Sequence, residues 1–147
     1  IYDTVQYVKP HVRTIAVGMC MSAAAMILCG GAAGKRMALP NAKIMIHQGS
    51  AGFQGTPTDI EIHAKEVLSL RQKMAEIIAE HTSQDVKQVE KDIDRDRFMT
   101  SEEAKAYGII DEIISSRTIA EKSELIEGEP ARLAEAKAEE TPARKPE

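Results

Sequence analysis

The sequence of 147 residues has few aromatic side chains: two Phe, three Tyr and no Trp. Because hydrophobic residues still make up 43% of the chain, a core must be built mainly from Ile, Leu, Val, Met and Ala. Cysteine is also rare. Cys20 and Cys29 lie in apolar stretches, which argues against a disulfide framework and a cysteine-based metal site. We therefore expect reduced thiols and no bound metal ion.

Neither sign of charge dominates, since 19 Lys and Arg face 23 Asp and Glu, for a net charge of −4. No basic patch alternates with aromatic residues, so the sequence does not predict a nucleic-acid-binding surface. No hydrophobic run approaches the roughly 18 residues that a membrane span needs. The length fits one domain. The first residue is Ile, not Met, so we expect a fragment that lacks its N-terminal part.

Hydrophobic periodicity predicts a mixed α/β chain. Helices are predicted at 1–9, after Ser22, and at 59–81, 83–91 and 101–107, and strands at 14–17, 35–39, 42–48 and 109–114. The long helix would begin with Thr58 as its N-cap and Glu61 completing a capping box. At 1.5 Å per residue it would be roughly 35 Å long, and a helix of that length often projects into a partner.

The last part of the chain differs in composition from the rest. Residues 117–147 are rich in Ala, Glu, Lys, Arg and Pro and have no apolar periodicity. Such a segment buries too little apolar surface to offset the entropy of ordering. We predict a folded domain over 1–116 and a disordered tail over 117–147.

Ser22 is the first candidate for chemistry, because it follows a β-branched run and opens an alanine-rich helix. Free backbone N–H groups and the positive end of the helix dipole lie at such a position. The serine could be a plain N-cap. It could instead be a nucleophile, which would need a histidine base and an orienting group.

His47 is the candidate base, since it ends an apolar strand beside the glycine-rich segment 49–55. That segment is either a flexible loop or a strand that gains order from something laid against it. For His11, in a surface turn, and for His63 and His81, on the long helix, solvated or core-edge positions are expected. Taken alone, His47 could also be a core-edge histidine.

A third group, a carboxylate, would hold the imidazole in the required tautomer. Asp94 and Asp96 both lie just before a predicted helix start, in an alternating charge run that could also be a solvated surface. Spacing alone does not choose between them. The residues thus predict a hydrolytic triad of Ser22, His47 and either Asp94 or Asp96.

The sequence resembles the proteolytic subunit family of the Clp protease (ClpP) from Ile1 to about Ile114. The matching motifs are Leu39-Pro40-Asn41, Met45-Ile46-His47-Gln48, Gly52-Phe53-Gln54-Gly55, Thr58-Asp59-Ile60-Glu61-Ile62-His63-Ala64 and Asp94-Arg95-Asp96-Arg97-Phe98-Met99. The resemblance implies an α/β fold of the ClpP/crotonase type, a superhelix of repeated β-β-α units with a projecting handle helix.

The resemblance also implies a serine endopeptidase acting by acyl transfer. Position by position, the nucleophile falls on Ser22, the general base on His47 and the orienting acid on Asp96. One oxyanion donor would be the backbone N–H of Ala23. The family's second donor lies in a glycine pair upstream of Ile1, outside this sequence.

Further expectations concern substrate and assembly. The resemblance places the substrate groove at Gly49, Ser50, Ala51, Gly52 and Phe53, and the contact between rings at Gln54, Asp94 and Arg95. It implies two stacked heptameric rings, a tetradecamer, that cleave unfolded proteins delivered by a Clp/Hsp100 AAA+ unfoldase. ATP would be used by that partner, with no cofactor in this chain, and the location would be cytoplasmic, or an organelle matrix or stroma in a eukaryote.

One local departure and two alternatives remain. Met21 and Ala23, on either side of the candidate nucleophile, swap the sizes usual in the family and could reshape the substrate pocket. A non-catalytic subunit of a mixed ring is one alternative, against which the presence of all three triad residues argues. The other is a crotonase-fold acyl-CoA enzyme, which would need acidic catalytic residues and a CoA site.

Overall fold

The structure is a computed structural model that describes residues 1–115, so the predicted tail at 117–147 lies outside the described residues. Residues Ile1–Ile113 pack as one compact unit. In the described part of the chain, no helix is both long enough and apolar enough to cross a membrane.

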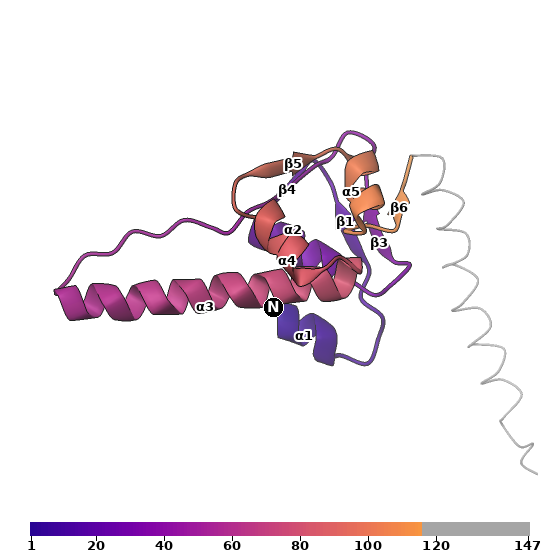
Figure 1. The fold of residues 1–147 in the computed structure, drawn as a ribbon. Coiled ribbons are helices and arrows are strands. Elements are labelled where there is room, and N and C mark those ends of the chain that lie inside the picture. Colours follow the sequence, from indigo (N-terminus) through magenta and orange to yellow (C-terminus); the bar gives the residue numbers. More distant parts are fainter. Residues whose placement is uncertain (116–147) are drawn as a thin grey trace, which may run out of the picture. The chain divides into compact units, whose positions relative to one another are not determined.

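Two β-β-α units follow one another along the chain, as the family resemblance implies (Figure 1). The elements are α1 (Tyr2–Tyr7), β1 (Thr14–Ala16), β2 (Met19–Met21), α2 (Ala23–Cys29), β3 (Arg36–Ala38), β4 (Lys43–Ile46), α3 (Pro57–Thr82), α4 (Val86–Asp92), β5 (Arg97–Met99), α5 (Ser101–Tyr107) and β6 (Glu112–Ile113). The first unit is β1-β2-α2 and the second is β3-β4-α3.

The strands of each unit separate into two sheets. The first strands, β1 and β3, pair in parallel and are joined by β6. The second strands, β2 and β4, also pair in parallel, and β5 adds antiparallel to β4. Because the two units repeat the same path, corresponding strands end at the same edge of each sheet. The predicted α/β superhelix is confirmed.

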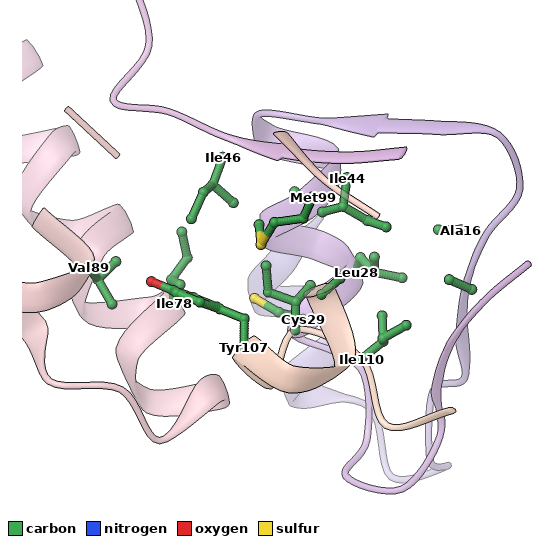
Figure 2. Close-up of a cluster of buried hydrophobic side chains, with 14 of the residues drawn as sticks. Ala16, Leu28, Cys29, Ile44, Ile46, Ile78, Val89, Met99, Tyr107 and Ile110 are labelled. Carbon is green, nitrogen blue, oxygen red and sulfur yellow. The ribbon is translucent and has the colours of Figure 1, made fainter. Parts of the chain in front are cut away.

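The core is aliphatic, as the scarcity of aromatic residues requires (Figure 2). Helix α2 contributes Ala25, Leu28 and Cys29, each at most 3% exposed. Tyr107 at the end of α5 is the one aromatic residue in this buried cluster of the described chain. Small and β-branched side chains let the helix lie close to both sheets.

The long helix α3 contains 26 residues, and its beginning differs from the prediction. Thr56, not Thr58, is the N-cap: its side chain accepts a hydrogen bond from the Asp59 N–H, and the Asp59 carboxylate accepts one from the Thr56 N–H. Pro57 occupies the first helical position, where its missing N–H costs nothing. The predicted box of Thr58 and Glu61 is therefore wrong.

Only the C-terminal part of α3 is packed against the core. The buried residues of this helix are Ala75, Ile77, Ile78, Ala79 and Thr82. Its N-terminal part instead exposes large apolar side chains, at Ile60, Ile62, Leu68 and Leu70. The first half of the helix thus projects from the unit with an unpaired apolar surface.

Other boundaries also differ from the prediction. Strands β2 and β5 were not predicted, and the closing strand is limited to Glu112–Ile113. The strand predicted to run to Gln48 ends at Ile46. The short fourth helix begins at Val86 after the N-cap Asp85, not at Ser83. The helix predicted at 101–107 is confirmed as α5, and Thr100 and Glu103 form a capping box at its start.

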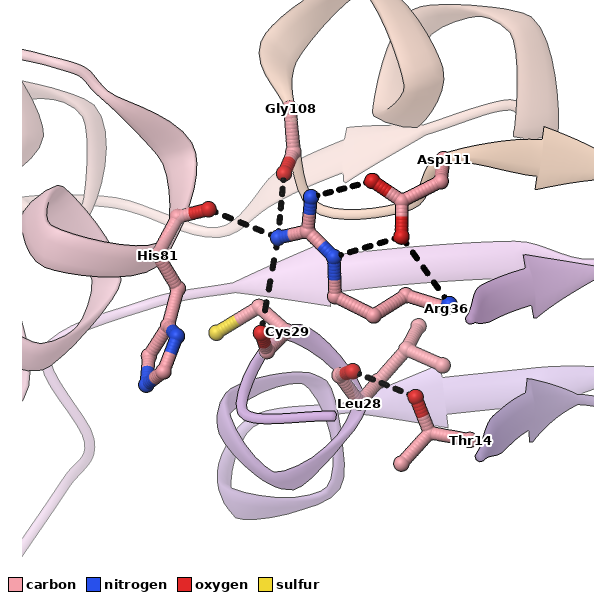
Figure 3. Close-up of polar contacts among 7 residues, drawn as sticks. All are labelled: Thr14, Leu28, Cys29, Arg36, His81, Gly108 and Asp111. Carbon is pink, nitrogen blue, oxygen red and sulfur yellow. Dashed lines mark hydrogen bonds and ion pairs between the residues drawn. The ribbon is translucent and has the colours of Figure 1, made fainter. Parts of the chain in front are cut away.

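A single arginine joins the ends of three helices (Figure 3). Nη1 of Arg36 donates to the carbonyl oxygens of Cys29, His81 and Gly108, at 3.5, 2.6 and 2.9 Å. These residues lie at the C-terminal ends of α2, α3 and α5, where carbonyl groups lack intrahelical partners. Nε and Nη2 of Arg36 donate to the carboxylate of Asp111 at 2.9 and 2.5 Å.

Candidate active site

The three residues of the predicted triad meet at one edge of the β2-β4-β5 sheet. Ser22 follows β2 and His47 follows β4, and these strands are parallel. Asp96 immediately precedes β5, which runs antiparallel to β4. The carboxyl ends of β2 and β4 and the amino end of β5 therefore lie together.

The side chains form a continuous chain of polar contacts. Oγ of Ser22 lies 2.8 Å from Nε2 of His47. Nδ1 of His47 lies 3.0 Å from Oδ1 of Asp96. The imidazole is largely covered, with 22% of its side chain exposed, whereas 60% of the Asp96 side chain is exposed. One ring nitrogen thus faces a hydroxyl and the other a carboxylate.

The backbone of Ser22 has an unusual conformation. Its φ of 57° and ψ of −123° differ from the extended conformation of an ordinary N-cap. Its N–H donates to the Met45 carbonyl at 2.8 Å, which continues the pairing of β2 with β4 by one residue. A positive φ at a residue with a side chain costs of order 1–3 kcal/mol. A strained turn between a strand and a helix presents a serine hydroxyl in the same way in other hydrolases.

The Ser22 side chain does not cap its helix. Its hydroxyl makes no capping hydrogen bond to α2 within the described residues. Ala23 is the first residue of α2, so its N–H has no intrahelical acceptor. The start of the helix therefore places a free donor next to the hydroxyl that contacts His47.

The structure separates the two carboxylates that the sequence left open. Asp94 faces α3 and β4: its Oδ1 lies 3.7 Å from Nη2 of Arg71, and its carbonyl accepts from Nε2 of Gln48 at 2.8 Å. Asp96 faces His47. Gln48 was not among the predicted site residues, and its backbone N–H also donates to the Ile93 carbonyl at 2.6 Å. Its place next to a candidate histidine was the available signal.

A comparison with known families identifies the family of this chain. The sequence model of the Clp protease family matches residues 1–117 of this chain. The chain belongs to the Clp protease family. It has the ClpP-type fold, as predicted, and it is a protease by family.

In this Clp protease a pocket of about 580 Å³ opens beside the imidazole. Its lining consists of His47, Gln48, Gly49, Ser50, Asp94, Arg95 and Asp96. Two of the residues predicted for the substrate groove and two predicted for the ring contact therefore share one cavity with His47 and Asp96, whereas Ser22 does not line it. The side chain of Arg95 is 93% exposed.

The segment from Gly49 to Phe53 forms no strand in this single chain. It leaves the end of β4 and leads to the start of α3 (Figure 1). Residues 49–52 and Gln54 are exposed, while Phe53 is half-buried and stacks on the His63 ring with centroids 5.3 Å apart. The backbone N–H and C=O groups of the exposed residues 49–52 are thus accessible for pairing with another extended chain.

No thiol competes with Ser22 as a nucleophile. Burial raises the pKa of Cys29 to about 12 and also raises the pKa of Cys20, so both remain protonated at neutral pH. Among residues 1–115, no group of three or more His, Cys, Asp or Glu side chains is placed to hold a metal ion.

The remaining histidines lie away from the triad. His81 contacts the hydroxyl of Tyr2 through Nε2 at 2.6 Å, and His11 is exposed. Desolvation lowers the pKa of His81. Both positions are typical of structural or solvated histidines.

Proposed function

We propose that this Clp protease chain is a serine endopeptidase subunit with Ser22 as nucleophile, His47 as general base and Asp96 as orienting acid. The observation that supports this most is the contact of Ser22 Oγ with His47 Nε2 at 2.8 Å, made by a serine that opens a helix without capping it. The Ser22 hydroxyl thus contacts His47 and does not cap α2.

In the proposed reaction Nε2 of His47 accepts the proton of Ser22 as Oγ attacks a peptide carbonyl. The imidazolium that forms is stabilised by the Asp96 carboxylate at Nδ1. The imidazolium then donates its Nε2 proton to the leaving amine, so that the C–N bond breaks and an acyl-enzyme remains. Water, activated by the same imidazole, hydrolyses the ester and restores Ser22.

The N–H of Ala23 is the proposed oxyanion donor. It stands at the N-terminal end of α2, where the dipole also favours negative charge. Removing one such donor typically lowers kcat about 10²–10³-fold. Met21 and Ala23 flank Ser22, so they would shape the pocket for the residue whose carbonyl is attacked.

The segment Gly49–Phe53 is the proposed binding strand for an extended substrate. Exposed backbone beside the triad suits β-augmentation, which recognises main chain more than side chains. Binding of this kind would allow the cleavage of unfolded polypeptides of varied sequence.

Assembly into two stacked heptameric rings completes the proposal. The projecting apolar half of α3, together with Gln54, Asp94 and Arg95, would form the contact between rings. A Clp/Hsp100 AAA+ unfoldase would deliver substrates and use ATP, and this chain would need no cofactor. The domain would comprise residues 1–116, and the complex would work in the cytoplasm, or in an organelle matrix or stroma.

Labelling with a fluorophosphonate tests the proposed nucleophile. The assembled protein is treated with the probe and the adduct is located by mass spectrometry, beside the variants Ser22→Ala and His47→Ala. We expect one adduct, on Ser22, that is absent from both variants. An assembled double ring that does not react would contradict the proposal and leave a non-catalytic subunit.

A further inference from the structure

The segment that carries Asp96 is anchored in its first half, where the carbonyl oxygens of Ile93 and Asp94 accept hydrogen bonds from Gln48. It joins α4 to β5 over residues 93–96, and Asp96 reaches His47 with a side chain that is 60% exposed. The neighbouring Arg95 is almost fully exposed. The Gln48 contacts fix the first half of this short loop, so the position of the Asp96 carboxylate depends further on the two ends of the loop, where it meets α4 and β5.

Those two ends are joined to each other by side chains. Asp92 is the last residue of α4 and Arg97 is the first of β5, and Nη1 of Arg97 is paired with Oδ1 of Asp92. The Asp92 side chain is only 10% exposed. The ion pair thus closes the loop at its base, on the side of the protein interior.

The pair is in turn fixed to the core. The Tyr107 hydroxyl donates to Oδ2 of Asp92 at 2.9 Å, and the Arg97 guanidinium lies over the Tyr107 ring, 4.9 Å from its centroid. Tyr107 is 8% exposed and packs among the core side chains (Figure 2). Burial and the bond to Asp92 raise its pKa, so the hydroxyl remains a donor. Gln88 adds a bond to Asp92 at 3.1 Å.

The pairing of β4 with β5 connects the Asp92–Arg97 ion pair to the proposed base, His47. Arg97 is paired with Ile46 across β5 and β4, and each is followed or preceded directly by a triad residue. Asp96 and His47 are thus the neighbouring residues of this pair, on the same side of it along the sheet. Successive side chains of a strand point to opposite faces, so the guanidinium can reach the interior while the Asp96 carboxylate reaches His47.

We propose that Arg97 is a positioning residue for Asp96, held by Asp92 and Tyr107 so that the Asp96 carboxylate stays within hydrogen-bonding distance of His47. This inference rests on the proposed role of Asp96 in the triad. Arginine suits the task because its planar fork can bind a carboxylate and stack on a ring at once.

Kinetics of the assembled enzyme on a fluorogenic peptide are the first measurement. We expect Arg97→Met to lower kcat about 10–100-fold, as a displacement near 1 Å does, with KM within about twofold because no substrate contact is lost. Arg97→Lys keeps the charge but not the fork, so it should recover part of the rate. Lys105→Met, which removes an exposed basic side chain from α5, is the matched control and should leave kcat unchanged.

A double-mutant cycle separates positioning from general destabilisation. If Arg97 acts through Asp96, Arg97→Met should change kcat less than about twofold in an Asp96→Asn background. A full additional loss in that background would overturn the proposal. Tyr107→Phe, which keeps the ring but loses the hydroxyl, should show a smaller effect with the same dependence on Asp96.

A spectroscopic readout does not depend on turnover. With ¹⁵N-labelled histidine, the proton on Nδ1 of His47 should give a downfield resonance, assigned by its absence in His47→Gln. We expect the resonance to be lost or shifted in both Asp96→Asn and Arg97→Met and kept in Lys105→Met. An unchanged resonance in Arg97→Met would refute the positioning role. A normal resonance in a wild-type protein without peptidase activity would instead contradict the proposed function alone.

Discussion

Arg36 and Asp111 hold each other at three points. Both Nε and the backbone N–H of Arg36 donate to Oδ2 of Asp111, at 2.9 and 3.0 Å, and Nη2 donates to Oδ1 at 2.5 Å. The contact joins β3 to the chain before β6. It also orients the Arg36 guanidinium, which donates hydrogen bonds to carbonyl groups at the ends of three helices. Its side chains are 10% and 23% exposed, respectively. Stability therefore depends on both partners.

We expect Asp111→Asn to lower the free energy of unfolding by about 3 kcal/mol, because removing one partner leaves a largely buried cation without its counter-charge. The hydrogen bonds to Arg36 hold the pKa of Asp111 below its usual value, which is about 3.9. The stabilisation is therefore present above about pH 4 and is lost as pH falls further, through the folded pKa. Urea unfolding at pH 7 and pH 3 measures both effects.

The difference between wild type and Asp111→Asn should therefore shrink at the lower pH. Glu61→Gln is the control, since Glu61 forms an exposed pair with Lys65 on α3, and such pairs contribute less than about 1 kcal/mol. A difference between wild type and Asp111→Asn that grows on acidification would contradict the assigned direction of the shift.

The sequence predicted elements whose signals are local. Thr100 and Glu103 are three residues apart and Gly108 ends the same helix with φ of 95°, so the bounds of α5 followed directly. A Cβ at Gly108 would lie 2.7 Å from the Thr82 carbonyl oxygen, which adds a steric reason for glycine. Ser22 and His47 were found because each stands where an apolar run ends.

What the sequence could not decide depends on contacts between distant segments. Strands β2 and β5 have three residues each and exist because both pair with β4. Asp94 and Asp96 occupy the same charge run and differ only in which way a loop turns them. The choice of Asp96 as the orienting acid came from the family resemblance, because residue spacing could not distinguish the two carboxylates.

The sequence predicted Thr58 with Glu61 as the capping box of α3, whereas the structure has Thr56 with Asp59 in that role. We expect Thr56→Ala to destabilise the first turn by about 1 kcal/mol, because the cap bond to the Asp59 N–H is lost. Thr58→Ala should have little effect. Hydrogen exchange of the first turn of α3 measures the difference, and equal exchange in both variants would contradict the assignment of the cap.

The contact of His81 with Tyr2 predicts a pH-dependent stability near neutrality. Desolvation lowers the pKa of His81, with Glu80 opposing and Arg36 adding to the shift. The unfolded value is about 6.5, so stability is present above that pH and is lost as pH falls through the folded pKa. We expect the urea midpoint of wild type to fall between pH 7.5 and pH 5.5.

The variant His81→Asn isolates this effect, since it retains the other three histidines but not the titrating group. Its midpoint should change less than that of wild type over the same interval. The same fall in both proteins would assign the pH dependence to another group.

The last prediction separates the two acids that the sequence left open as the third member of the triad. Asp96→Asn should lower kcat by about 10⁴-fold, the loss typical of a triad whose imidazole loses its orienting carboxylate. Asp94→Asn removes a group that faces Gln48 and Arg71. It should change kcat per assembled ring by no more than a few-fold, although it could weaken assembly. Peptidase activity normalised to the double-ring fraction, measured by sedimentation, compares the two variants on the same basis. A greater loss per ring in Asp94→Asn than in Asp96→Asn would mean that the carboxylate 3.0 Å from His47 is not the orienting acid.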